Sequence, residues 1–521
     1  MKFKARQNSK LLDMRENAME MKSGIYGSTL VSNLKCEDLS DIRKSMNFLL
    51  QQGKNARKTV ILSDPAGKPK PQLYEEIANI LQQNIIERFI GIGPGFCENR
   101  EQFKYQNQAF YKNVSKFLEN EDLLSFEEHF ILVAGSSKSN FQKLDYVFQE
   151  KTHETILNIS LDNLIHNLNV YRSVLKPNVK LMVMVKAAAY GSGITQIGNL
   201  LQANDVDYLG VAYPDEGINL RLAGVELPIM VLSPEQSGYE AMIRFNLEPE
   251  IYNLRGFRAF TEKLKKSASE FENPYPIHIK VDTGMNRLGF EEHQIDELIE
   301  QLRSEPSVRV TSVMSHLAVS EDPNENDFTL GQIEKFERIA QKLEKELGYS
   351  FQKHILNSSG ISRFPDAQFD MVRLGLGIYG VTGDKELQPK LKHISSLRSE
   401  IVQIREIEAG ETVGYGRAEK ASKKMRIATV SIGYADGLDR RLGNRKAHML
   451  INNQPAPIIG NICMDMCMLD ITDLTDVKEG DEVIVFGQNQ TVQQLAKIME
   501  TIPYEVLTSV SGRVKRVYLQ E

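Results

Sequence analysis

The segment LMVMVKAAAYGSG (181–193) is an apolar run that ends in Lys186 and continues into small residues and a glycine turn. An apolar run between polar flanks predicts a buried β-strand. Lysine is rare at the inner end of such a strand, because burial of its charge is costly. In a barrel, Lys186 would lie at the carboxyl end of its strand, where barrel enzymes place catalytic groups. Desolvation would lower the pKa of its amine and favour a Schiff base with an aldehyde; the alternative is a lysine whose stem lies along the surface.

Further apolar runs follow this segment and alternate with helical stretches such as DELIEQLRS (296–304) and FERIAQKLEKEL (336–347). With KLMVMVKA (180–187), the expected strands are 207–213, 228–233, 247–253, 277–284, 310–318, 353–360 and 371–380. Eight strand–helix units over ~230 residues have the size of a (β/α)8 TIM barrel. A doubly wound open sheet gives the same alternation, so the strand count leaves that alternative open.

The pattern changes on both sides of the barrel segment. After about residue 390, runs such as RIATVSIGYADG (426–437) and GDEVIVFG (480–487) are short, alternating and broken by Gly, Pro or Asn-Asn, which predicts an all-β domain with a barrel-like form. The first 150 residues predict a small α/β unit with a parallel sheet, from the apolar runs 58–64, 88–95 and 129–139 and a helix over 71–84. The charged segment DYVFQEKTHET (145–155) looks like a boundary. We therefore expect domains at 1–150, 151–394 and 395–521.

The bulk composition is that of an ordinary globular protein, with 41% hydrophobic and 25% charged residues in 521. A net charge of -6 without a Lys/Arg-rich block argues against a nucleic-acid partner. Four cysteines in so long a chain do not form a disulfide framework, and Cys463 and Cys467 have no nearby second pair that would complete a zinc site. The N-terminal 24 residues have no apolar core, and no uninterrupted apolar run reaches the ~18 residues of a membrane span. We expect a cytoplasmic protein without a metal.

The segment around Lys186 resembles the signature of the alanine racemase family, written roughly as VKANAYGHG, and the resemblance continues in order through the rest of the chain. It implies a TIM barrel followed by a β-domain, with pyridoxal 5'-phosphate as cofactor. Lys186 would bind the cofactor, and Tyr190 would reach its phosphate. Ala188 stands where the family usually has Asn, and Ser192 where it often has His. We expect these departures to alter neighbouring contacts and not to abolish activity.

The segment IHIKVDTGMNRLGF (277–290) matches the next motif of the family. The resemblance gives Arg287 contacts with the substrate carboxylate and the catalytic tyrosine, a task suited to its planar fork. Lys280 lies at a position often carbamylated in the family; a plain lysine on a barrel strand is the alternative. His316, in MSHLA (314–318), would lie against the cofactor ring.

The segments ILNSSG (355–360) and RLGLGIYG (373–380) look like phosphate-binding loops at the last two barrel strands, a common place for phosphate in this fold. By resemblance, the residues that bind it are Asn357, Ser358, Gly375 and Leu376. Arg373 would donate a hydrogen bond to the pyridine nitrogen. Because arginine stays protonated, that nitrogen would remain an unprotonated acceptor, a weaker electron sink that disfavours transamination.

The β-domain supplies the other half of the catalytic pair by resemblance. ETVGYGRAEK (411–420) matches the motif of the second acid/base, which makes Tyr415 that residue. Tyr434 would narrow the substrate channel, and the backbone N–H of Met464 would hold the substrate carboxylate. In the family these three residues act in the partner's site, which implies a homodimer. Gly512 stands where many members have a phosphate-contacting tyrosine.

The first 150 residues resemble the C-terminal domain of the muramyl-tripeptide:D-alanyl-D-alanine ligase family, through KTVILSDPAGKPKPQLYEEIA (58–78) and RFIGIGPG (88–95). The ligase motifs are altered, with GIYGSTLVSN (24–33) and AGSS (134–137) at their places, and no P-loop occurs. We expect a degenerate domain without ligase activity.

These observations predict an enzyme that interconverts L- and D-alanine by a two-base mechanism with Lys186 and Tyr415, and supplies D-alanine for peptidoglycan. A related pyridoxal barrel enzyme, acting on serine or decarboxylating an amino acid, is one alternative, since one extra hydroxyl changes binding by only ~1–3 kcal/mol. A scaffold protein that has kept the fold is another, but it would be expected to have lost the acid/base pair.

Overall fold

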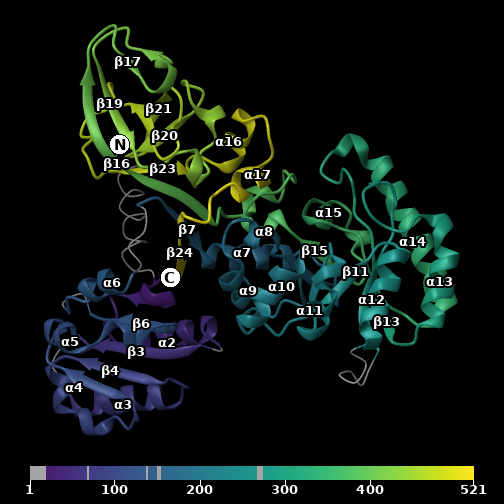
Figure 1. Ribbon diagram of the computed structural model, residues 1–521, viewed down its shortest axis with the longest axis horizontal. Helices are drawn as coiled ribbons and strands as arrows, with labels where there is room; N and C mark the ends of the chain where they lie inside the picture. Colours follow the sequence, from purple (N-terminus) through teal and green to yellow (C-terminus); the bar gives the residue numbers. More distant parts are fainter. Residues whose placement is uncertain are drawn as a thin grey trace. The chain divides into compact units, whose positions relative to one another are not determined.

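A computed structural model describes residues 19–54, 56–66, 70–136, 139–149, 154–266 and 274–520 (Figure 1). Residues 1–18 of the N-terminal segment, and 150–153 of the expected boundary, lie outside the described residues. The chain forms two compact units. The first consists of Met1–Asp162, Ser395–Thr491 and Val510–Glu521, and the second of Asn163–Ile394 and Val492–Ser509.

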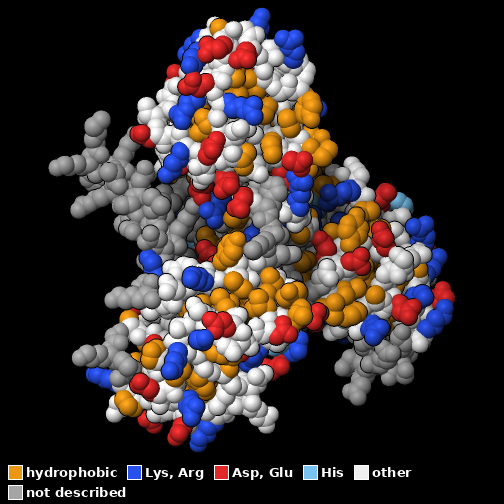
Figure 2. Space-filling view, turned by 60° about the vertical axis from the view of Figure 1, so that its left-hand side comes forward, with side chains coloured by type: hydrophobic (Ala, Val, Ile, Leu, Met, Phe, Trp, Pro, Cys, Tyr) orange, Lys and Arg blue, Asp and Glu red, His pale blue; other side chains and the backbone are white. Residues whose placement is uncertain are grey.

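Acidic and basic side chains are interspersed on the face of the molecule in Figure 2. Among the described residues, no helix is both long and apolar enough to cross a membrane. The same residues contain no group of three or more His, Cys, Asp or Glu side chains placed to hold a metal ion. All four cysteines are free thiols.

The second unit contains the predicted barrel. Its strands are β8 (Lys180–Met184), β9 (Tyr208–Val211), β10 (Ile229–Val231), β11 (Glu248–Ile251), β12 (Tyr275–Lys280), β13 (Val308–Met314), β14 (Gln352–His354) and β15 (Met371–Leu374). They pair in parallel in chain order, and β15 returns to pair with β8. Backbone hydrogen bonds from Asp370 N to Lys353 O and from Arg373 N to Leu356 O, both 3.1 Å, complete the ring between β14 and β15. The barrel is thus confirmed, and the open-sheet alternative is excluded.

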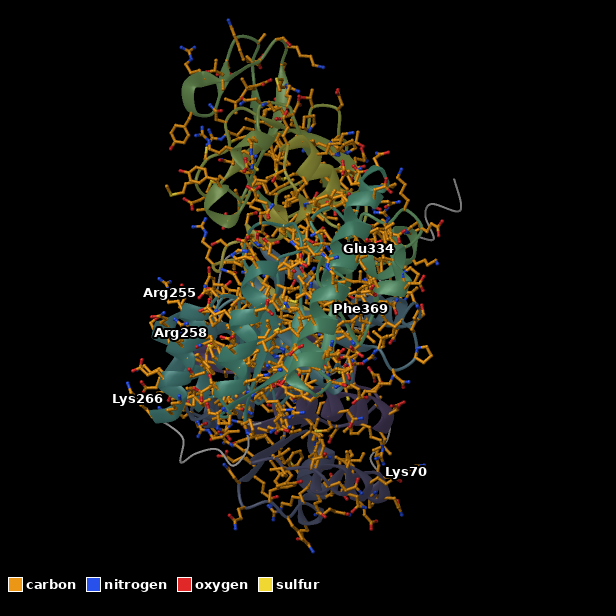
Figure 3. The ribbon with its side chains drawn as sticks, turned by 90° about the vertical axis from the view of Figure 1, so that its right-hand side faces the viewer. Lys70, Arg255, Arg258, Lys266, Glu334 and Phe369 are labelled. Carbon is orange, nitrogen blue, oxygen red and sulfur yellow. The ribbon has the colours of Figure 1, made fainter. Side chains whose placement is uncertain are left out.

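Helices alternate with these strands, and the longer ones cover the outside of the barrel (Figure 1). They are α7 (Leu161–Arg172), α8 (Lys186–Tyr190), α9 (Ile194–Ala203), α10 (Pro214–Leu222), α11 (Tyr239–Arg244), α12 (Leu254–Lys266), α13 (Ile295–Ser304), α14 (Asn326–Leu347) and α15 (Ser358–Arg363). Helix α12 shows why such helices pack on the barrel. Phe257 and Phe260 recur at helical spacing and are buried. On the outer side of the helix the exposed residues include Arg255, Arg258 and Lys266 (Figure 3). The short helices α16 (Val492–Ile498) and α17 (Pro503–Thr508) come from the C-terminal segment and belong to this unit.

The predicted all-β domain is a closed ring of antiparallel strands within the described part of the first unit. Its strands are β16 (Ser395–Ile407), β19 (Met425–Val430), β20 (His448–Ile451), β21 (Gln454–Ile459), β22 (Cys467–Asp470) and β23 (Glu482–Phe486). The order β19-β22-β21-β20-β23-β16 closes because β16 also pairs with β19. The hairpin β17 (Thr412–Val413) and β18 (Glu419–Lys420) adds a small two-stranded sheet. The predicted barrel-like form is therefore confirmed.

The N-terminal α/β sheet has the parallel order β2-β6-β3-β4-β5, with β1 antiparallel to β2. Its elements are β1 (Met19–Ser23), β2 (Thr29–Asn33), α2 (Leu39–Gln52), β3 (Arg57–Ser63), α3 (Pro71–Gln82), β4 (Arg88–Ile92), α4 (Pro94–Glu98), β5 (Gln108–Tyr111), α5 (Val114–Asn120), β6 (His129–Ala134) and α6 (Gln142–Phe148). One face packs against α5 and α6 in a core that includes Ile61, Ile131, Phe117 and Phe148. The predicted parallel sheet with alternating helices is confirmed.

A continuous ladder joins this sheet to the ring of the β-domain. Strand β7 (Ile156–Ser160) pairs with β16 and with β24 (Lys515–Gln520), and β24 pairs in turn with β1. The N-terminal sheet is therefore attached by backbone hydrogen bonds and not merely by its connecting segment. The domain boundaries expected from the sequence stay predictions.

Candidate active site

Lys186 follows β8 and begins α8, a single turn of unusual hand. Ala187, Ala188, Ala189 and Tyr190 all have positive φ, between 52° and 54°. Left-handed backbone costs roughly 1–2 kcal/mol per L-residue, least where side chains are small, which suits three successive alanines. The turn is held by the hydrogen bond from Ala187 N to Glu216 Oε1 (2.5 Å) and by Gly191 N, which donates to Ala187 O (2.9 Å). Strained backbone of this kind clusters at functional sites, and this turn directly follows Lys186.

The amine of Lys186 lies among positive charges. Burial lowers its pKa, and Arg287 and Lys280 lower it further, while Glu216 and Glu250 oppose the shift. A lysine with a lowered pKa holds more of its neutral, nucleophilic form at neutral pH. The position of Lys186 therefore favours the neutral amine that Schiff-base formation requires.

Tyr190, Ser358 and Gly375 converge on one point. A Cβ added to Gly375 would lie 3.0 Å from Tyr190 Oη and 3.7 Å from Ser358 Oγ. Ser358 Oγ accepts hydrogen bonds from Gly375 N (2.8 Å) and Gly377 N (3.3 Å). Leu376 begins the short 3-10 helix η9 (Leu376–Tyr379), directly after this point. A small space lined by two hydroxyls and a glycine backbone fits a phosphate group.

We call this space, lined by Tyr190, Ser358 and Gly375, the phosphate cradle. Aromatic rings and a helix cap support it. The Tyr190 ring packs on Tyr379, with centroids 4.5 Å apart, and on Tyr504 of α17, at 5.7 Å. Asn357 caps α15, because its Oδ1 accepts from Gly360 N (3.0 Å) and also from Ser320 Oγ (2.7 Å). Asn357 thus orients the loop from within, and Ser358 is the side chain at the cradle.

Arg373 is buried and uses both of its terminal nitrogens. Nη1 donates to His354 Nδ1 (2.8 Å), and Nη2 donates to Ser315 O (2.6 Å), Ile355 O (3.0 Å) and His316 Nδ1 (3.2 Å). Within the described residues, Nε has no acceptor. Burial lowers the pKa of Arg373 to about 10, so it is still protonated at neutral pH. Its Nε–H is therefore a fixed donor that suits an uncharged ring nitrogen.

A hydrogen-bonded chain continues from Arg373 through the barrel interior. His354 Nε2 contacts Ser312 Oγ (2.8 Å), which contacts His278 Nδ1 (2.6 Å), and His278 Nε2 contacts Glu248 Oε2 (2.7 Å). Because arginine can only donate, His354 must accept at Nδ1 and carry its proton on Nε2. The direction then passes through Ser312 to His278, whose Nε2–H points to the carboxylate. The contact with Arg373 fixes the tautomer of His354, and the hydrogen bonds of the chain hold the plane of the Arg373 guanidinium.

Neutral histidines surround this arginine. Burial lowers the pKa of His316 well below its ordinary value, and Arg373 lowers it further. Burial and Arg373 do the same to His354. His316 therefore presents an uncharged ring, as a partner for an aromatic cofactor requires.

Arg287 is exposed in the loop after β12, and the structure gives it no fixed partner among the described residues. Asp282 shapes this loop, since its Oδ1 accepts from the backbone N–H groups of Gly284 (2.9 Å), Met285 (3.1 Å) and Asn286 (3.2 Å). Lys280, at the end of β12, points into the barrel and donates to Glu250 Oε1 (3.0 Å). The free guanidinium of Arg287 can bind a carboxylate.

The three β-domain residues gather in one cluster of exposed loops. Tyr415, Tyr434 and Met464 are 72%, 43% and 54% exposed. Asn461 Nδ2 donates to Tyr415 O (2.9 Å), and Ala435 N donates to Met464 O (3.0 Å). The Met464 N–H has no acceptor within the described residues. A Cβ on Gly512 would meet no atom within 4 Å, so that position is open.

The sequence analysis did not identify Glu216, Glu250 or His354 as residues of the site. For Glu250 a signal was present: it lies on a barrel strand at the alternate position to Glu248, and such polar side chains of an apolar strand point to the same side. Glu216 had none, because its role depends on a backbone turn that forms elsewhere in the chain.

The chain matches two family models. Residues 159–383 match the N-terminal domain of alanine racemase, and residues 394–518 match its C-terminal domain. The alanine racemase of Clostridium kluyveri is 34% identical over 390 residues, covering 73% of this chain and 96% of that protein. That of Clostridium tetani is 36% identical over 374 residues, covering 70% and 95%.

Solved structures of alanine racemases also resemble this chain. Alanine racemase from Clostridium difficile is 34% identical, with a TM-score of 0.67 over 71% of this chain and 98% of that one. The enzyme from Bartonella henselae, solved with covalently bound pyridoxal phosphate, is 29% identical, with a TM-score of 0.62 over 71% of this chain and 100% of that one. On these sequence and structural matches, the chain belongs to the alanine racemase family of pyridoxal-phosphate-dependent isomerases.

Proposed function

We propose that this protein interconverts L- and D-alanine with Lys186 and Tyr415 as its two acid/base groups, and so supplies D-alanine for peptidoglycan. The observation that carries the proposal is a lysine of lowered pKa, held by a left-handed turn that leads directly into a phosphate cradle. Pyridoxal phosphate, when bound, withdraws electrons from the substrate Cα and makes the α-proton removable.

The cofactor would be held at both ends. The phosphate would bind to the hydroxyls of Tyr190 and Ser358 and to the backbone at Gly375 and Leu376. Asn357 would orient the loop that carries Ser358. At the other end, Arg373 Nε would donate to the ring nitrogen, since its other nitrogens are already engaged. His316 would lie against the ring face. An uncharged ring nitrogen limits electron withdrawal and favours return of the proton to Cα over transamination.

Lys186 and Tyr415 would serve opposite faces of the substrate. Racemisation requires removal of the α-proton on one face and its delivery on the other. Arg287 would bind the substrate carboxylate and help Tyr415 to give up its proton through its positive charge. Met464 N–H would hold the same carboxylate, and Tyr434 would limit the size of the substrate.

We assign Tyr415, Tyr434 and Met464 to the active site of a partner subunit in a homodimer. Their exposure in one cluster supports this assignment, because a contiguous exposed apolar patch often marks an interaction site. The unpaired Met464 N–H supports it too.

The dimer assignment can be tested by mixing two inactive variants, Lys186→Ala and Tyr415→Phe. If each site takes Tyr415 from the partner, a mixed dimer has one intact site. Random reassortment should then restore about a quarter of the native activity. Restoration to background only, in dimers shown to have exchanged subunits, would place Tyr415 in the site of its own chain.

The reaction itself is tested by following D-alanine formation from L-alanine, with L-serine as a matched competitor. We expect the alanine rate to exceed the serine rate, because Tyr434 would limit the size of the substrate side chain. Faster serine turnover would move the protein to the serine-specific alternative.

For the N-terminal domain we propose a degenerate relative of the muramyl-tripeptide:D-alanyl-D-alanine ligase domain, without ligase activity. Its parallel sheet and its strand-end Asp64, fully engaged by Gly95, Phe96 and Tyr74, support this. ATP hydrolysis dependent on a muramyl tripeptide and D-alanyl-D-alanine would contradict it. The four free cysteines fit a reducing compartment, and we propose the cytoplasm.

A further inference from the structure

Tyr434 and Met464 lie on two segments of the β-domain, 433–436 and 463–466, which we call the paired loops. The two segments are joined to each other by backbone hydrogen bonds. Ala435 N donates to Met464 O (3.0 Å), and Tyr434 N donates in the same way to the carbonyl of the residue before Met464 (3.0 Å). The paired loops therefore lie side by side, although almost thirty residues of sequence separate them.

A single guanidinium bridges both of these loops. Arg513 Nε donates to Asp436 Oδ1 (2.7 Å) in the first loop, and Nη2 donates to Asp465 Oδ1 (2.8 Å) in the second. Asp436 is 0% exposed, and its other oxygen accepts from Gly433 N (2.8 Å). Hydrogen bonds to the two carboxylates raise the pKa of Arg513, so the guanidinium stays charged. A charged, planar donor between two carboxylates is a strong and directional contact.

Arg513 is itself held on a well-anchored segment of backbone. Arg516 Nη1 donates to Ser511 O and, at 2.6 Å, to Val514 O, so it folds the backbone around Arg513 into a turn. Ser511 N also donates to Asp436 O (3.1 Å). The strand that follows, β24, is paired on both of its edges, with β7 and with β1. The position of Arg513 is thus set by a folded turn and by a strand with two neighbours.

We propose that Arg513 is a positioning residue, which holds the loops of Tyr434 and Met464 together as one unit. The inference rests on the proposed function for its effect on catalysis, and on the contacts of Arg513 for the clamp itself. Met464 N–H would hold the substrate carboxylate, and Tyr434 would limit the substrate side chain. A clamp on both loops therefore sets carboxylate binding and size selection together.

The physical reason is that a backbone N–H binds an anion well only when it is already aimed at it. Ordering a loop at the moment of binding costs free energy, which a loop fixed in advance does not lose. Met464 N–H has no acceptor within the described residues, so its direction depends on the loop that carries it. Asp465, the next residue, is the point at which Arg513 holds that loop.

The first test is hydrogen exchange of the full-length protein, supplied with cofactor but not with alanine, followed by mass spectrometry of peptides from the paired loops. In Arg513→Gln we expect both loops to exchange roughly tenfold faster, since hydrogen bonds between charged groups are lost. Arg513→Lys keeps the charge and replaces the planar fork by a single nitrogen, so its exchange rates should be intermediate. Exchange in folded Arg513→Gln that equals that of the unaltered protein would refute the clamp.

Arg445→Gln is the matched control. Arg445 also bridges two carboxylates of the β-domain, from Nε to Glu419 Oε1 (2.8 Å) and from Nη2 to Asp470 Oδ2 (2.9 Å). Its side chain is 42% exposed, against 39% for Arg513. Neither carboxylate belongs to the paired loops, so this variant should leave their exchange unchanged. Equal acceleration in the two variants would overturn the proposal, because it would mean a general loosening of the domain.

The second test separates KM from kcat, with alanine as substrate. Arg513→Gln should raise KM about tenfold and leave kcat within about threefold, because the clamp serves substrate binding. Tyr415 is held separately, since Asn461 Nδ2 donates to its carbonyl oxygen (2.9 Å). The preference for alanine over serine should narrow in the same variant, because Tyr434 is held by the same clamp. A fall in kcat at unchanged KM would contradict the assignment.

A double variant identifies the contact that carries the effect. If Arg513 acts through Asp465, then Arg513→Gln combined with Asp465→Asn should raise KM by less than the product of the two single effects. Effects that multiply fully would show that the two side chains act independently, and the clamp would be rejected.

The inference and the proposed function fail separately. An unaltered holoenzyme that does not racemise alanine counts against the proposed function, while hydrogen exchange still decides whether Arg513 clamps the paired loops. A working racemase whose KM for alanine is the same in Arg513→Gln would remove this residue from the reaction, even if the loops exchange faster.

Discussion

The barrel and the N-terminal sheet are both parallel sheets covered by helices, yet their strand ends differ. At the carboxyl ends of β3 and β4, Asp64 accepts hydrogen bonds from Gly95 N (2.8 Å), Phe96 N (2.9 Å) and Tyr74 Oη (3.0 Å). Ser63 Oγ likewise accepts from Ser136 N (2.8 Å). The polar groups of the N-terminal sheet thus bind one another and hold its loops together.

At the same ends of the barrel strands, donors are left for a ligand. Arg373 keeps Nε, Lys186 keeps a partly buried amine, and Ser358 shares its cradle with Tyr190. Both regions are parallel sheets covered by helices, so this shared feature does not explain the difference in chemistry. What distinguishes the two regions is whether the polar groups at the strand ends have partners within the protein.

The comparison is tested most directly by Lys186→Ala. We expect racemisation to fall by at least about a thousandfold, because the group that binds the cofactor and moves one proton is lost. D-Alanine formation measures the effect, and the thermal midpoint should change little, since the side chain is only partly buried. Residual activity within tenfold of native would remove Lys186 from the mechanism.

A smaller effect is expected from His354→Phe, which keeps an aromatic ring and removes the side-chain acceptor of Arg373 Nη1, leaving that nitrogen only the His354 carbonyl oxygen (3.1 Å). The buried network would be left with an unpaired donor, at a cost of about 2–3 kcal/mol in unfolding free energy. Turnover should drop roughly ten- to a hundredfold as the Arg373 guanidinium loses its fixed plane. Denaturant unfolding and steady-state kinetics measure the two effects. The milder control is Ser312→Ala, one bond further away; an equal effect on turnover would show that the arginine is oriented by something else.

On the N-terminal side, Asp64→Ala should cost about 2 kcal/mol of unfolding free energy, since two backbone N–H groups and the Tyr74 hydroxyl lose their acceptor. Racemisation should stay within twofold of native. Tyr74→Phe, which removes one of the three bonds, is the graded control. A large fall in turnover with the fold intact would break the comparison, because it would give this sheet a role in the reaction.

The smallest expected difference between the two regions is in how much stability each loses at acidic pH. Burial lowers the pKa of His129 in the N-terminal sheet, and burial and Arg373 lower those of His316 and His354 in the barrel. The folded protein keeps these rings neutral, whereas the unfolded chain takes up their protons below ~6.5. Stability is therefore present at neutral pH and declines as the pH falls from that value toward the lowered pKa values.

His393, in the same compact unit as the barrel, also has a pKa lowered by burial. With three such histidines against one, the barrel unit should lose more protection than the N-terminal sheet. Hydrogen exchange of β13 and β6 amides, corrected for intrinsic rates, compares neutral pH with about pH 5. Equal losses in the two strands would mean that the barrel histidines do not govern its acid sensitivity.

The sequence determined the architecture because the signals were local. Alternating apolar strands and amphipathic helices predicted the barrel, and short runs broken by turn residues predicted the β-domain. The order of the motifs around Lys186, Arg373 and Tyr415 indicated the family, which the comparisons confirmed. The roles assigned to individual site residues stay predictions, although the structure places Tyr190, Ser358 and Gly375 together.

The tertiary structure decided what no local pattern contains. The ring of the β-domain closes because β16 is long enough to pair on both of its edges, and the N-terminal sheet joins it because β24, from the far end of the chain, pairs with β1. The groups that act on Lys186 and Arg373 likewise come from other elements: Glu216 from helix α10, Glu250 from β11 and His354 from β14. Hydrogen bonds and ion pairs depend on distance in space, and only the folded chain brings together residues that the sequence separates.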